Sequence, residues 1–225
     1  MMPSYKDFGK GKKIDPLIQL LRSNPEVLIL LGKIWDILYI EGSSPDIGKR
    51  REHVIRILLE EEFGLRVTPA PPMEREWDFS VMIKGEEKKY SLKTTENITT
   101  LKVAWNGFPS MERAQRFEFK YPILYVTRTR TREKKRIEVY VFEIDDLMKL
   151  KEEMGVSMWW IPSNKTNPRG FGIKTKAVRN LIEKAKAKGN FVVVDYRYNI
   201  NIENIKERYW KMWYNMLKKL ASELE

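Results

Sequence analysis

The sequence contains no cysteine and a single histidine, His53, among its 225 residues. The absence of cysteine excludes disulfides, zinc–thiolate sites and cysteine nucleophiles. One histidine cannot build a multi-histidine metal site. Any bound metal ion must therefore be held by carboxylates, carbonyls and water, which favours Mg²⁺, with Mn²⁺ as the alternative.

Long apolar runs are also missing. No stretch of the chain approaches the roughly 18 consecutive apolar residues of a membrane span. The opening residues, Met1 to Asp7, lack the hydrophobic region of a secretory signal. We therefore expect a cytoplasmic protein that has no membrane partner.

The composition favours a folded protein with a polyanionic partner. Hydrophobic residues make up 42% of the chain, enough for the core of one large domain. The formal net charge of +11 favours binding to nucleic acid, although basic proteins without that function exist. The many lysine, glutamate, arginine and isoleucine residues are typical of a thermophile.

Hydrophobic periodicity predicts an alternation of helices and strands. Helices are expected over 15–40 (with a break near Pro25), 48–63, 111–117, 145–154, 174–188 and 202–224. Strands are expected over 77–83, 88–93, 121–126, 136–142 and 191–194, with 68–73 as an irregular loop. The order favours an α/β or α+β fold with a central mixed β-sheet flanked by helices. We expect a single domain over 1–225, made of a helical N-terminal extension (1–47), a core (48–142) and a C-terminal part (143–225).

Residues 77–93 are the most informative segment. Apolar and polar residues alternate from Trp77 to Ile83, which predicts a half-buried strand, and Gly85 to Glu87 are expected to form the turn. On the return strand, Ser91 and Lys93 share a face. Asp78, Ser91 and Lys93 are therefore expected to converge, either as a simple cross-strand ion pair or as a site for a divalent ion and a water that attacks phosphate.

Glu52 adds a fourth polar residue to this group. On the predicted helix it lies on the same side as Ile55 and Leu59, which are expected to face the core. A carboxylate there needs a partner or a metal ion, although acids are also common in the first turn of a helix. His53 points about a hundred degrees away, so we interpret it as a surface or structural residue.

The segment from Gly48 to Lys93 resembles the core of the PD-(D/E)xK nuclease superfamily, which includes type II restriction endonucleases and archaeal Holliday-junction resolvases. The resemblance covers roughly residues 48–126. It implies that Asp78 binds the metal ion and that Glu52 is the auxiliary acid of the helix. It also implies that Ser91-Leu92-Lys93 is the (D/E)xK element, with the Leu92 carbonyl as a metal ligand.

The sequence departs from the family pattern at two positions. Trp77 replaces the proline of the motif, which is a common variation. Ser91 replaces an acid, and a hydroxyl is a poor substitute for a carboxylate. The missing acid is expected from Glu112, from Glu96 as a second candidate, or from Glu52 alone.

The resemblance implies in-line attack of a metal-activated water on phosphorus, with Lys93 stabilising charge or orienting the water. The leading interpretation is a Mg²⁺-dependent type II restriction endonuclease of a thermophilic archaeal type, which cleaves double-stranded DNA as a homodimer. The alternatives are a Holliday-junction resolvase and a non-catalytic DNA-binding protein on a decayed nuclease fold. A metal-free RNA-processing endonuclease would need a histidine base, and only His53 is available.

Several basic and polar residues are candidates for DNA contact. Arg128, Arg130 and Arg132 alternate with threonines and are expected on one face of a strand, either in a DNA groove or at a solvated hairpin tip. The other candidates are Lys134, Lys135, Asn164, Lys165, Asn167, Arg169 and Lys102. The predicted terminal helix has a wide apolar face, which is more typical of core than of a subunit interface. This helix and the N-terminal helical region are nevertheless the two candidates for pairing the subunits of a homodimer.

Overall fold

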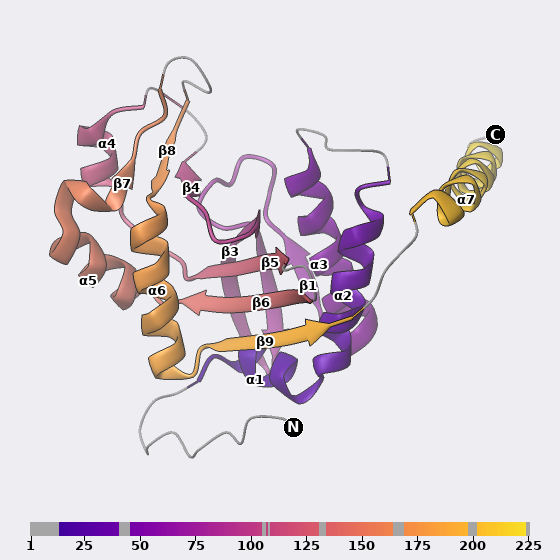
Figure 1. Ribbon diagram of the computed structural model, residues 1–225, viewed down its shortest axis with the longest axis horizontal. Helices are drawn as coiled ribbons and strands as arrows, with labels where there is room; N and C mark the ends of the chain where they lie inside the picture. The colour runs from indigo at the N-terminus through magenta and orange to yellow at the C-terminus, as the bar shows by residue number, and fades with distance from the viewer. Residues whose placement is uncertain are drawn as a thin grey trace.

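The computed structural model describes residues 14–40, 46–104, 107, 109–130, 134–163, 169–197 and 202–223. Its centre is a six-stranded sheet in the order β1-β2-β3-β5-β6-β9 (Figure 1). These strands are β1 (Val67–Pro69), β2 (Phe79–Ile83), β3 (Glu86–Glu96), β5 (Ile123–Arg130), β6 (Lys135–Phe142) and β9 (Phe191–Tyr196). β3 and β5 pair in parallel, and the other neighbouring strands pair antiparallel. The predicted mixed central sheet is confirmed.

Helices cover both faces of this sheet (Figure 1). On one side lie α1 (Pro16–Ser23), α2 (Pro25–Ile37) and α3 (Ile47–Phe63), and on the other α5 (Ile144–Met154) and α6 (Thr175–Lys188). The side chains of β5 alternate between the two cores: Leu124 and Val126 pack with the first set of helices, and Ile123 and Tyr125 with the second. This alternation is the period of two that a strand buried on both faces requires.

A small second sheet was not predicted. It contains β4 (Leu101–Ala104), β8 (Phe171–Ile173) and β7 (Trp159–Trp160), and it packs with η1 (Gly155–Met158) and α4 (Met111–Arg116). A Cβ added at Gly172 would lie 2.5 Å from the carbonyl oxygen of Leu101. Glycine is therefore needed for β8 to approach β4. The strands of this sheet have two to four residues, too few to produce a visible periodicity.

The turn of the β2–β3 hairpin differs from the prediction. Ile83 pairs with Glu86, so the turn consists of Lys84 and Gly85, both with positive φ, at 52° and 82°. A two-residue turn of this kind matches the twist of the flanking strands. Glu86 and Glu87 therefore belong to β3, and the predicted turn at Gly85 to Glu87 begins one residue and ends two residues too late.

Local capping signals account for the helix ends. The Asp15 carboxylate caps α1 by accepting bonds from the backbone N–H groups of Leu17 and Ile18. Gly64 ends α3 in the left-handed conformation. Ser110 caps α4 through its hydroxyl. The predicted loop at 68–73 is wrong in its first part, because residues 67–69 form β1 against β2.

The terminal helix α7 (Ile202–Ser222) projects from the body of the molecule (Figure 1). From Glu203 to Glu223 its side chains are exposed, apart from the half-buried Ile205 and Tyr209. The expectation that its apolar face belongs to the core is therefore wrong. In the described part of the chain no helix has the length and apolarity needed to cross a membrane.

Candidate active site

Asp78, Ser91 and Lys93 converge as the hairpin pattern predicted. One oxygen of Asp78, Oδ2, accepts a bond from the backbone N–H of Leu92 at 2.5 Å. The same atom accepts from the Lys93 ammonium at 3.1 Å and from the Ser91 hydroxyl at 3.3 Å. The second oxygen, Oδ1, has no hydrogen-bond donor among the described residues. Asp78 is thus held in place and still offers one oxygen to a further ligand.

The strand register produces this convergence. Phe79 pairs with Tyr90, so Asp78 lies beside Ser91 at the end of the ladder, and its backbone N–H donates to the Tyr90 carbonyl at 2.8 Å. Leu92 packs in the core against the first set of helices. Because neighbours on a strand point to opposite faces, Ser91 and Lys93 point the other way. Backbone pairing therefore positions the site rigidly.

Glu52 of α3 belongs to the same electrostatic group. Burial raises the pKa of its carboxyl, and the nearby negative charge of Asp78 raises this pKa further. Lys93 acts in the opposite direction. Two carboxylates and one ammonium therefore lie close enough to influence one another, which is the arrangement that a divalent cation stabilises.

Glu52→Gln is expected to stabilise the metal-free protein at neutral pH. Because the pKa of Glu52 is raised in the folded state, the wild type loses stability as the pH rises from the ordinary carboxyl range through the raised value. Glutamine carries no charge at either pH. Thermal unfolding with a chelator present should give similar melting temperatures near pH 4 and a higher one for Glu52→Gln at pH 7. A less stable variant at pH 7 would mean that attraction by Lys93 outweighs burial.

Glu112 and Glu96, the two acids expected to replace the carboxylate missing at Ser91, do not lie beside Asp78. Glu112 is exposed on α4, where it pairs with Arg116 at 2.7 Å. Glu96 lies three residues after Lys93 on the same strand, hence on the opposite face, and pairs with Arg51 at 3.2 Å. In the described ranges, no group of three or more His, Asp or Glu side chains is arranged to hold a metal ion. The expectation that Glu112 or Glu96 joins Asp78 is therefore not supported by the geometry.

Two other acids lie nearer to Ser91, and sequence analysis did not identify them. A small cavity of about 50 Å³ is lined by Ser91 together with Glu76 and Glu118. Glu76 pairs with Lys120 across this cavity at 2.5 Å, and both of these side chains are partly exposed. Glu76 precedes Asp78 by two residues, which is the only sequence signal. Glu118 lies in an irregular segment after α4, which no pattern places beside β3.

Arg128 is a core residue, so the expectation that it contacts DNA is wrong for this conformation. Only 2% of its surface is exposed. Its guanidinium contacts the buried carboxylate of Asp36, and it pairs with Glu96 at 3.0 Å. Glu96 also accepts from Trp35 Nε1 at 2.5 Å. A guanidinium that is paired on both sides and buried has no free donors for a DNA groove.

The remaining DNA-contact candidates have different surroundings. Arg130 shares the face of Arg128 but is 54% exposed, and it reaches Asp36 at 3.2 Å. Lys135 also pairs with Asp36, at 2.6 Å, and Lys134 lies 4.0 Å from Asp195. Lys102 is half-buried on β4, where burial lowers its pKa, and Arg169 is exposed. Arg132, Asn164, Lys165 and Asn167 lie outside the described residues.

His53 has the surface position that the helix geometry predicted. Its side chain is exposed, and its Nδ1 lies 2.5 Å from the guanidinium of Arg56 one turn along α3. The interpretation of His53 as a surface residue is confirmed.

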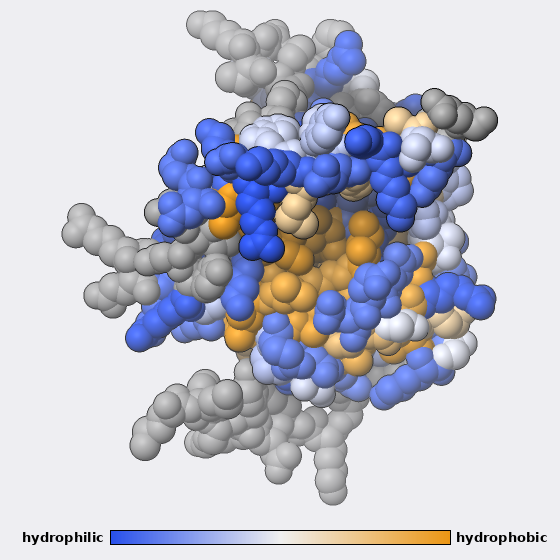
Figure 2. Space-filling model, turned by 90° about the vertical axis from the view of Figure 1, so that its right-hand side faces the viewer, coloured by the Kyte–Doolittle hydropathy of each residue, from blue (hydrophilic) through white to orange (hydrophobic). Residues whose placement is uncertain are grey.

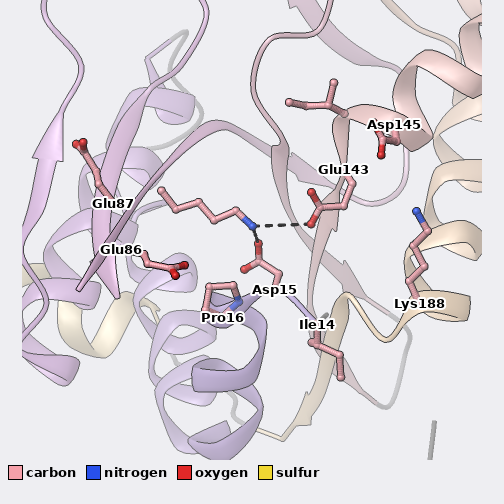
Figure 3. Close-up of a pocket in the computed structure, with 10 residues that line it drawn as sticks. Ile14, Asp15, Pro16, Glu86, Glu87, Glu143, Asp145 and Lys188 are labelled. Carbon is pink, nitrogen blue, oxygen red and sulfur yellow. Dashed lines mark hydrogen bonds and ion pairs between the residues drawn. The ribbon is translucent and has the colours of Figure 1, made fainter. Parts of the chain in front are cut away.

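A larger cavity, of about 580 Å³, lies at the start of β3, where it is lined by the first residues of α1 and of α5 (Figure 3). Asp15 and Glu143 point into its centre (Figure 3), and the Lys88 ammonium contacts Asp15 and lies 3.9 Å from Glu143. Tyr90 donates its hydroxyl to Asp15 at 3.0 Å. These charges are paired with one another and cap α1, so we interpret this cluster as structural.

The comparisons with known proteins support the fold. Neither a scan of protein-family models nor a search of curated protein sequences finds a match. A solved structure, a restriction endonuclease in complex with substrate DNA, superposes with a TM-score of 0.58 over 88% of this chain and 94% of its own. The chain has a restriction-endonuclease-like fold. The sequence identity is 19%, so the likeness concerns architecture. The predicted resemblance is confirmed at that level.

Proposed function

We propose that this protein is a Mg²⁺-dependent endonuclease that cleaves double-stranded DNA at a short specific site, as type II restriction endonucleases do. The observation that carries the proposal is the convergence of Asp78, Ser91 and Lys93 at the β2–β3 hairpin of a restriction-endonuclease-like fold, where the charges of Asp78 and Lys93 also act on Glu52 of α3. The similar solved structure contains DNA as its substrate. The net charge of +11 supports a polyanionic substrate for this chain too.

The donor set fits a magnesium ion. Mg²⁺ is usually bound by one or two carboxylates together with water and substrate oxygens. Asp78 has a free Oδ1, Glu52 is the neighbouring acid, and the backbone carbonyl of Leu92 belongs to the same strand segment. Mn²⁺ prefers the same ligands. When bound, the metal ion would generate a nucleophilic water and neutralise charge on the phosphate.

The protein side chains would have distinct roles. Lys93 lies 3.1 Å from Asp78, so its ammonium stands where it can orient the attacking water or stabilise the charge that develops on the phosphate. Ser91 donates to Asp78 and fixes its orientation instead of binding metal itself. Glu76 or Glu118, which line the cavity beside Ser91, would supply a further carboxylate.

Basic residues other than the buried Arg128 would hold the DNA. Arg130 and Arg169 are exposed, Lys134 and Lys135 extend from the start of β6, and Lys102 lies on β4. We propose that these side chains contact the DNA backbone, together with Arg132, Asn164, Lys165 and Asn167, which lie outside the described residues. Cleavage of both strands of a symmetric site would be achieved by a homodimer.

The proposal is tested by digestion of two substrates in parallel, a plasmid and a synthetic four-way junction, each with Mg²⁺ and with a chelator. A site-specific endonuclease should cut the plasmid into discrete fragments only with Mg²⁺ and leave the junction arms intact. Preferential cutting of the junction would favour a resolvase. Tight DNA binding without cleavage of either substrate would identify a non-catalytic DNA-binding protein.

Glu52→Gln is expected to reduce cleavage by orders of magnitude, and Glu112→Gln is expected to have little effect. Glu52 lies in the electrostatic group of Asp78, whereas Glu112 pairs with Arg116 on an outer helix. Loss of a ligand weakens metal binding, so the defect of Glu52→Gln should shrink at high Mg²⁺ concentration. Single-turnover cleavage against Mg²⁺ concentration measures both variants. Wild-type behaviour of Glu52→Gln would move the second ligand to Glu76 or Glu118.

A further inference from the structure

Helix α7 carries a large apolar surface that no part of its own chain covers. Apart from Tyr214, whose ring carries a polar hydroxyl, its exposed large hydrophobic side chains are each between 39% and 63% accessible, and they are Trp210, Met212, Trp213, Met216, Leu217 and Leu220. Figure 1 shows α7 directed away from the central sheet and from α2. Solvent exposure of this many large apolar groups on a single helix is typical of an interaction surface.

These side chains form one continuous face. At about 100° per residue they span about 160° of the helix, from Met212 to Trp210, with Trp213 and Leu220 at the centre. A two-helix seam needs a narrower stripe than this. The face therefore suits a broad surface better than a single helix of similar size.

The area is sufficient for a stable interface. Six large side chains at about half exposure offer roughly 100 Å² each, if a large side chain buries about 200 Å² in full. The helix alone would then bury roughly 600 Å², and a specific interface buries about 800 Å² on each partner. In a symmetric dimer with two such contacts, each subunit would bury its own α7 face and the surface that receives the α7 of the other copy. The buried area on each partner would then exceed 800 Å².

The same chain offers a broad apolar surface on the side that carries α2 and α3. Figure 2 shows apolar side chains gathered in a hollow there, rimmed by polar residues. Ile57 is 53% exposed and lies on the side of α3 opposite the core-facing Ile55. On α2, Ile34 and Ile37 are half-buried and do not belong to the core cluster that contains Trp35. α2 thus carries apolar side chains outside its core-facing side as well, as expected of a helix that is covered on more than one side.

We propose that α7 of one subunit packs into the α2–α3 apolar hollow of a second copy of this chain, and that the two copies exchange α7 reciprocally. Both surfaces are apolar, both belong to every copy, and α7 points away from its own body, where a partner can reach it. A reciprocal exchange closes with two-fold symmetry and leaves neither surface exposed. The proposal rests on the proposed function in one respect, namely that cleavage of both DNA strands requires a homodimer.

The test is the oligomeric state of the full chain without DNA, measured by sedimentation velocity, so that it is independent of cleavage. The wild type should be a dimer. Trp213→Glu and Ile57→Glu should each weaken dimerisation by at least about 10²-fold, because each places an acid within the apolar contact. Asn215→Glu adds the same charge on the polar face of α7 and should leave the dimer intact. Circular dichroism and thermal melting check that the variants fold.

Mixing the two disruptive variants gives a sharper test. A Trp213→Glu chain keeps an intact hollow, and an Ile57→Glu chain keeps an intact α7, so a mixture restores one of the two contacts. Native mass spectrometry should then detect heterodimers in excess of either homodimer. A monomeric wild type would overturn the proposal, as would a dimer insensitive to Trp213→Glu. Loss of dimer in Trp213→Glu but not in Ile57→Glu would also overturn it, by pointing to α7–α7 pairing.

Discussion

Asp78→Asn and Lys93→Met should each abolish detectable cleavage while the protein stays folded and binds DNA. Removal of a single electrostatic stabiliser from an active site costs about 10²–10³ in rate. Asp78 contacts Ser91, Leu92 and Lys93 through one oxygen and offers the other to a ligand, so its loss should be at least as severe. Binding should not weaken in Asp78→Asn, because the substitution removes a negative charge from the path of a phosphate.

Single-turnover cleavage and a binding titration in a chelator separate these two effects. Lys89→Met is the matched control for Lys93→Met, since Lys89 lies on the same face of β3 but contacts the ring of Trp77, 4.6 Å from its centre. The control should cleave at close to the wild-type rate. Cleavage by Asp78→Asn at the wild-type rate would mean that the chemistry takes place elsewhere on the molecule.

Arg128→Met is expected to destabilise the fold strongly. Its main effect should be on the free energy of unfolding and not on DNA binding. The substitution removes the buried guanidinium that pairs with Asp36 and Glu96. Breaking a buried ion pair by removing one partner costs about 3–5 kcal/mol, because a charge is left without compensation. For a chain of this size each kcal/mol lowers the melting temperature by about 2–4 °C, so a fall of roughly 6–20 °C is expected.

Arg130→Ala is the matched comparison, because Arg130 contacts the same carboxylate from an exposed position. Exposed ion pairs contribute about 0–1 kcal/mol, so its melting temperature should change little. If Arg130 contacts a phosphate, the salt dependence of DNA binding should fall by about one unit of slope. Equal melting temperatures for the two variants would show that Arg128 is not a structural residue.

The local parts of this structure were predictable from sequence. Alternation over 77–83 predicted the hairpin and the shared face of Asp78, Ser91 and Lys93, because a period of two fixes which side chains lie together. The predicted start of the first helix at residue 15 and end of the second at residue 63 lie within one residue of the observed ends of α1 and α3. The mixed sheet followed from the order of the elements.

Properties that depend on distant partners were not predictable. Arg128 alternates with threonines like an exposed residue, but its burial depends on Asp36, 92 residues away. Glu118 reaches the vicinity of Ser91 through an irregular segment that has no periodicity. The apolar face of α7 has the same sequence pattern whether it is buried in a core or exposed at a surface. Only the fold shows that it is exposed. Sequence periodicity reports that a face is apolar and does not report what covers it.

The central claim, that the β2–β3 hairpin cleaves double-stranded DNA, is tested most directly by digesting a complex genomic DNA with the wild type and with Asp78→Asn in Mg²⁺ and sequencing the ends. The account predicts that the wild type produces ends that share one short sequence, and that Asp78→Asn produces none above the chelator background. Intact DNA after incubation of the folded wild type with Mg²⁺ or Mn²⁺ would contradict the account. Identical ends from both proteins would also contradict it.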